Sequence, residues 1–117
     1  MKVISSEAVP PRPVTQEGAR ETTIRELITD REGAPTFAMR LFEVAPGGHT
    51  PFHAHAWEHE VYILEGAGQL ALADGPHPFS AGDAVFVPPD EQHQFLNTGQ
   101  TTLRFLCLIP VQNPCCR

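Results

Sequence analysis

The chain has 117 residues, with fourteen acidic and eight basic side chains and a formal net charge of −6. Its length suits one domain with one hydrophobic core, and its hydrophobic content of 41% is that of a globular protein. The negative charge argues against nucleic acid and against an anionic membrane surface as partners, because clustered lysine and arginine bind both.

Residues 1–20 predict an extended arm rather than a helix. Residues 9–14 contain three prolines, which remove backbone donors and fix φ. The arm has no apolar core of the signal-peptide kind, and no apolar run in the chain reaches the roughly 20 residues of a membrane span. We therefore expect a cytoplasmic protein whose arm lies on the domain or pairs with a partner subunit.

Residues 21–112 predict one all-β domain, a sandwich or barrel, because short strands alternate with turns and no stretch has helical periodicity. Pro46, Gly47 and Gly48 are expected to end the second strand. Residues 113–117 form a predicted tail with Cys115 and Cys116, and three cysteines give no disulfide framework. The expected strands are 22–29, 36–44, 53–64, 69–73, 76–79, 84–87, 93–96 and 101–109.

Three histidines of the same parity, His53, His55 and His59, lead into the apolar run 61–64. In an extended strand, positions two apart point to the same face and lie about 6.5 Å apart, so two imidazoles can converge on one ion. A buried polar group without a partner costs roughly 2–7 kcal/mol. Three such groups together therefore favour a metal site over three separate core or surface histidines.

A second segment continues this pattern. Gly82 opens a strand, Pro88 ends it, and His93 enters the next strand after a turn. His93 alone would more often be a core histidine with an ordinary hydrogen-bond partner. Paired with the upstream histidines, it becomes a candidate ligand.

The two segments resemble the two motifs of the cupin family over residues 47–97. The first motif is Gly, five residues, His-x-His, three or four residues, Glu, then a downstream Gly, which here comes one residue early. The second is Gly, five residues, Pro-x-Gly, two residues, His, three residues, Asn, with Asp90 in place of the turn glycine. The matching residues are Gly47, His53, His55, Glu60 and Gly66, then Gly82, Pro88, Asp90, His93 and Asn97. The resemblance implies a single-domain cupin fold, the double-stranded β-helix or jelly-roll barrel.

The run His-x-His-x-Trp-Glu-His-Glu is similar to small cupins with four histidines and no carboxylate at the metal. That resemblance implies His53, His55, His59 and His93 as ligands, with Mn or Fe favoured and Ni or Zn possible. Glu60 remains the alternative to His59 as third ligand. The sequence excludes His49 and His77, which lie near Gly48 and between two prolines.

The expected function is a metal-dependent enzyme for a small molecule, of dioxygenase or oxidoreductase type. One alternative is a lyase or isomerase with a Lewis-acid metal, in which Glu60, His49 or Tyr62 moves a proton. Another is a non-catalytic protein that binds a metal or small ligand. The resemblance also implies a homodimer.

Overall fold

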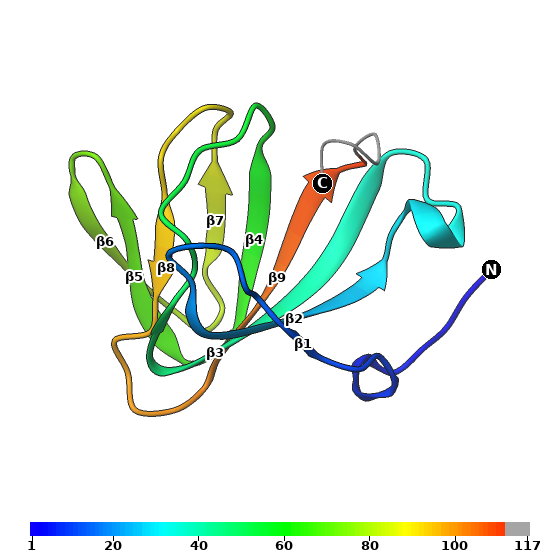
Figure 1. Ribbon diagram of the computed structural model, residues 1–117, viewed down its shortest axis with the longest axis horizontal. Helices are drawn as coiled ribbons and strands as arrows, with labels where there is room; N and C mark the ends of the chain where they lie inside the picture. Colours follow the sequence, from blue (N-terminus) through cyan, green and yellow to red (C-terminus); the bar gives the residue numbers. More distant parts are fainter. Residues whose placement is uncertain (112–117) are drawn as a thin grey trace.

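Nine antiparallel strands and two short 3-10 helices make up residues 1–111, the part of the chain that the computed structural model describes (Figure 1). The predicted all-β fold and single domain are confirmed. The predicted tail 113–117, with Cys115 and Cys116, lies outside the described residues. Among residues 1–111 no helix is long and apolar enough to cross a membrane.

The elements are η1 (Ser6–Ala8), β1 (Arg12–Pro13), β2 (Arg20–Ile28), η2 (Asp30–Glu32), β3 (Phe37–His49), β4 (His59–Glu65), β5 (Ala67–Leu72), β6 (Gly75–Ser80), β7 (Ala84–Val87), β8 (Gln94–Leu96) and β9 (Leu103–Pro110).

One sheet runs in the order β6-β5-β8-β3-β9-β4-β7, and β2 pairs with β3 while β1 pairs with β2. The sheet curls into a half-barrel with β6 and β7 at its two ends (Figure 1). Side chains alternate between the two faces of each strand, so every second residue points into the curl. Apolar side chains fill one end of this interior, and Val44, Ile63, Leu103 and Phe105 are at most 1% exposed.

Strand β3 is longer than the sequence predicts. Pro46, Gly47 and Gly48 do not end it, and it continues to His49. Gly47 has φ +80°, which bends the chain, but His49 pairs with Arg20 of β2 and with Leu96 of β8. The long-range pairing therefore keeps this segment in the sheet despite its local turn chemistry, as in a β-bulge.

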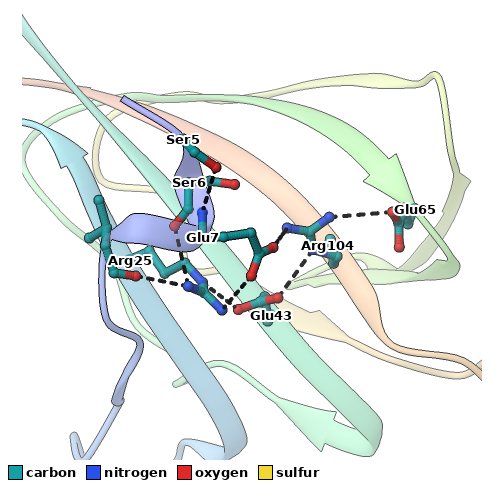
Figure 2. A network of polar contacts seen from close by, with 8 residues as sticks. Ser5, Ser6, Glu7, Arg25, Glu43, Glu65 and Arg104 are labelled. Atoms are coloured by element: carbon teal, nitrogen blue, oxygen red, sulfur yellow. Dashed lines mark hydrogen bonds and ion pairs between the residues drawn. The ribbon is translucent and has the colours of Figure 1, made fainter. Parts of the chain in front are cut away.

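The N-terminal arm is fixed to the outer face of the sheet by a network of charged side chains (Figure 2). Arg25 of β2 donates to the carbonyl of Val9 (2.8 Å) and to Glu43 of β3 (2.9 Å). Arg104 of β9 donates to the other oxygen of Glu43 (3.1 Å), and Glu7 lies within 3.8 Å of both arginines. The arm thus lies on its own domain, where β1 extends the sheet beside β2.

Candidate functional site

The four predicted histidines come from three separate parts of the chain. His59 opens β4, His93 directly precedes β8, and His53 and His55 lie in the loop before β4. The prediction of a continuous strand from His53 is wrong. Of residues 53–58, only His53 pairs with the sheet, through an isolated bridge to His93 (N···O distances of 3.1 and 2.9 Å). The backbone N–H of Asp90 donates to the carbonyl of His55 (2.6 Å), which ties this loop to the turn before β8.

Asp90 shows why that turn tolerates the absence of glycine. Its φ is +66°, in the left-handed region that glycine adopts most readily and that Asp tolerates better than most residues. The departure from the cupin motif therefore preserves the turn that holds His55 and presents His93.

Three of the four rings bring nitrogen atoms together. One ring nitrogen from each of His53, His55 and His93 lies within 4.8 Å of the others, and Nε2 of His53 is 3.1 Å from Nε2 of His55. Two nitrogens bound to one ion at about 2.1 Å with a right angle between the bonds are about 3.0 Å apart. The spacing of His53 and His55 therefore fits two adjacent ligands of one metal ion.

His59 lies beside this cluster but outside the three-residue set. Its ring centroid is 4.8 Å from that of His93 and 5.3 Å from that of His55. Its Nδ1 is 3.2 Å from Sγ of Cys107, whereas its Nε2 is buried without a hydrogen-bond partner among the described residues. A buried polar atom without a partner is costly, so a cation in the cluster would satisfy the fourth imidazole as well.

Contacts at the outer edge of the cluster engage the other ring nitrogens. Nδ1–H of His93 donates to the carbonyl of Glu91 (2.9 Å), and the Gln16 side-chain amide lies 3.4 Å from Nδ1 of His53. Such contacts orient a metal-binding imidazole and decide which nitrogen faces the ion. For His53, His59 and His93 they leave Nε2 as the nitrogen available at the centre.

All four imidazoles resist protonation. Burial, which is the largest cause, acts together with the neighbouring histidines and the charge of Arg40 to lower the pKa of His53 to about 4 and that of His59 to about 2. Burial is also the largest cause that lowers the pKa of His55 and of His93. The rings are therefore neutral at physiological pH, which is the form that binds metals.

The cluster lies in a cavity of about 620 Å³. Aromatic side chains form part of its wall, among them Phe42, Phe105 and Trp57, whose ring stacks on that of His55 at 4.4 Å. The volume is in the range of small-molecule binding sites. Trp57 is thus part of the pocket wall.

Two parts of the cavity wall were missed from the sequence. Val14, Thr15 and Gln16 of the N-terminal arm line it, and so does Arg40 of β3. The arm carried no signal of this, because its position depends on contacts with distant strands. Arg40 did carry a signal, because it is a charged residue between Ala38 and Phe42 on the inward face of a strand.

The candidate proton-transfer residues are not in the cavity. Glu60 and Tyr62 are exposed and line a separate outer hollow with Phe86. His49 contacts Gln94 (3.2 Å) outside the cavity wall, and His77, which the sequence excluded as a ligand, is exposed and contacts Asp74 (3.0 Å). Since alternate strand residues face opposite sides, the burial of His59 turns Glu60 away from the cluster.

Comparisons with known proteins identify the family and the fold. Residues 40–109 match the family model of the cupin domain. The solved structure of the polyketide cyclase RemF from Streptomyces resistomycificus is 41% identical, with a TM-score of 0.91 over 97% of this chain and 82% of that one. An oxalate-binding protein of Thermotoga maritima is 34% identical over 113 residues, 93% of each chain. Protein SchB of Streptomyces halstedii is 32% identical over 107 residues, 90% of this chain and 74% of that one.

Proposed function

The chain belongs to the cupin family, and from this premise we propose that it is a metal-dependent enzyme acting on a 1,3-dicarbonyl compound of polyketide type. His53, His55, His59 and His93 would hold the metal. The observation that carries the proposal is the convergence of neutral imidazole nitrogens inside an apolar cavity of about 620 Å³.

The donor set suits a divalent transition metal and leaves its charge unreduced. Imidazole binds Mn, Fe, Ni and Zn, and the expectation that Mn or Fe is the physiological ion remains a prediction. When bound, such an ion would act as a Lewis acid that polarises a substrate carbonyl and stabilises the enolate. Two adjacent carbonyl oxygens suit a site whose imidazoles leave ligand positions open.

The chain's own side chains would bind and orient the substrate. The aromatic walls formed by Phe42, Phe105 and Trp57 would pack against its apolar body and exclude water. Nδ1–H of His93 donates to the Glu91 carbonyl and so keeps that ring fixed while substrate binds. The polyketide cyclase RemF, 41% identical to this chain, supports this substrate class.

The keto–enol interconversion of benzoylacetone, followed by its ultraviolet absorbance after dilution into buffer, tests this function. We expect the zinc-loaded protein to accelerate the interconversion about a hundredfold, the effect of one well-placed electrostatic stabiliser. Chelation of the metal should remove the acceleration. A rate equal to that of zinc-free protein would contradict the proposal.

A dioxygenase is the second candidate, because neutral nitrogen ligands also suit redox-active iron and the apolar walls would admit dioxygen. The same preparations separate these functions. Dioxygen consumption with Fe or Mn, and none with Zn, would favour the dioxygenase. Saturable binding of benzoylacetone without turnover or dioxygen uptake would indicate a binding protein.

The choice of His59 over Glu60 as a ligand is tested by two single replacements. Glu60→Gln is expected to leave the metal content unchanged, because the exposed carboxylate lies on the outer face. His59→Ala should lower the metal affinity about a hundredfold or more, beyond the roughly 10–100-fold effect of losing an outer contact. Elemental analysis after dialysis measures both, and metal loss in Glu60→Gln alone would assign the carboxylate as ligand.

The homodimer remains a prediction. Phe86 on the edge strand β7 is 58% exposed and lies beside the exposed Tyr62 of β4, which gives an apolar surface at the end of the sheet. Such edges invite pairing with another chain. A solution mass equal to one chain would contradict it.

A further inference from the structure

We propose that Arg40 binds a carboxylate group of the substrate inside the cavity, so that the substrate is an acid with an apolar body. The inference rests on the proposed function for the other end of the substrate, which the metal would hold. The observation behind it is a guanidinium in the cavity wall whose donors are largely unused.

The strand register directs Arg40 inward. It lies on β3 opposite Glu26 of β2 on one side and Cys107 of β9 on the other, strands that are adjacent in the sheet (Figure 1). Its Nη2 donates to Sγ of Cys107 (3.0 Å), and its Cζ lies 5.1 Å from the centre of the Phe42 ring. The same sulfur contacts His59, so the guanidinium is separated from the histidine cluster by one atom.

No carboxylate among residues 1–111 forms an ion pair with Arg40. Glu26 is the acidic residue that lines the cavity, but Arg12 and Arg31 each bind one of its oxygens. The Nε of Arg40 is buried without a hydrogen-bond partner among the described residues. A guanidinium has five donors, and a thiol is a weak acceptor, so most of this capacity is free for a ligand.

The charge of the cavity favours an anion over a neutral ligand. Its lining carries Arg12 and Arg40 against Glu26, and a divalent ion on the imidazoles would add to the positive charge. This excess occurs in a protein with a net charge of −6. Arg40 is partly buried, and a charge removed from water without a counterion is costly, a cost that an anionic ligand would offset.

The chemistry of the group indicates a carboxylate. The planar guanidinium matches a carboxylate with two parallel hydrogen bonds. The neighbouring Phe42 and Phe105 rings suit an apolar body. With a metal beside His59, the matching ligand is a 3-oxo acid, in which one carbon atom separates a ketone directed to the metal from a carboxylate directed to Arg40.

Two probes of the same shape test the inference: benzoylacetate, which ends in a carboxylate, and benzoylacetone, which ends in a methyl ketone. Their affinities for zinc-loaded protein are measured by calorimetry for the parent protein and for Arg40→Met. We expect Arg40→Met to weaken benzoylacetate binding about 10–100-fold, the worth of a charge-assisted pair, and benzoylacetone binding less than about threefold. Equal losses for the two probes, or no loss for benzoylacetate, would overturn the inference.

Three further measurements separate ligand binding from a structural role. Zinc content should be the same in both proteins, and the melting temperature of Arg40→Met should be equal or higher, because no ion pair is lost. Arg20→Met, which removes an exposed arginine of β2 outside the cavity wall, should leave both affinities unchanged. Arg40→Lys keeps the charge but loses the planar fork, so its selective loss of benzoylacetate affinity should be smaller. It replaces Arg40→Met in the test if Arg40→Met folds poorly.

The result is distinguishable from a failure of the proposed function. A selective loss of benzoylacetate binding in Arg40→Met, in a protein that does not accelerate benzoylacetone enolisation, would support the carboxylate site and overturn the catalytic role. If the protein accelerates enolisation, and Arg40→Met and the parent bind benzoylacetate with equal affinity, the catalytic role is supported and the carboxylate site is overturned.

Discussion

Replacement of His93 by alanine is expected to remove the metal and with it all metal-dependent activity. His93 is 2% exposed, and its ring centroid lies 5.1 and 4.8 Å from those of His53 and His59, so its removal takes one imidazole out of the centre of the cluster. Because the imidazole is a proposed direct ligand, the loss of metal affinity should exceed the roughly 10–100-fold effect of removing an outer contact. Elemental analysis of dialysed protein measures it.

His77→Ala is the matched control for this experiment. His77 is exposed on β6 and contacts Asp74, away from the cavity, so its removal should leave the metal content unchanged. The circular dichroism spectrum of His93→Ala should resemble that of the parent, because its backbone bridge to His53 does not need the ring. Stoichiometric metal in folded His93→Ala would refute the proposed ligand set.

Removal of the metal is expected to lower the melting temperature by on the order of 15 °C. A ligand at a thousand times its dissociation constant stabilises the folded state by about 4.1 kcal/mol. In a domain of this size, each kcal/mol of unfolding free energy corresponds to several degrees of melting temperature. Calorimetry of metal-loaded and chelator-treated protein at pH 7.5 measures the shift, and an unchanged melting temperature would contradict a metal bound by the folded state alone.

The metal-free protein should also lose stability in acid. Burial holds the pKa of His53 near 4, whereas a histidine of the unfolded chain has a pKa of about 6.5. Between these values the unfolded chain binds more protons than the folded one, so stability is complete above pH 6.5 and falls as the pH decreases. Each such histidine contributes a slope of at most about 1.4 kcal/mol per pH unit.

Urea unfolding of the metal-free protein between pH 7.5 and 4 tests this dependence. His53→Gln, which cannot titrate, should reduce the slope below pH 6.5. The exposed His77 supplies the comparison, because His77→Gln should leave the slope unchanged. A free energy of unfolding that is constant from pH 7.5 to 4 would show that the rings are not buried as neutral groups.

Local sequence patterns were informative where the structure is local. Alternation and turn residues predicted most strands to within about two residues, for example 84–87 and 94–96 against the predicted 84–87 and 93–96. They failed at Gly47 and at His53, where long-range pairing decides whether the backbone is in the sheet. Pro46-Gly47-Gly48 has the chemistry of a chain break, yet β2 and β8 hold it in place.

The sequence by itself determined the all-β fold, the cupin motifs and the residue types of the site, because strand periodicity and ligand spacing are properties of neighbouring residues. Only the tertiary structure decided which groups share the cavity. Arg40 faces the histidines because β3 lies between β2 and β9, and Gln16 reaches His53 because the arm folds back over the sheet. Such proximity depends on strand order and burial, which join residues far apart in the chain and leave no periodic signal in it.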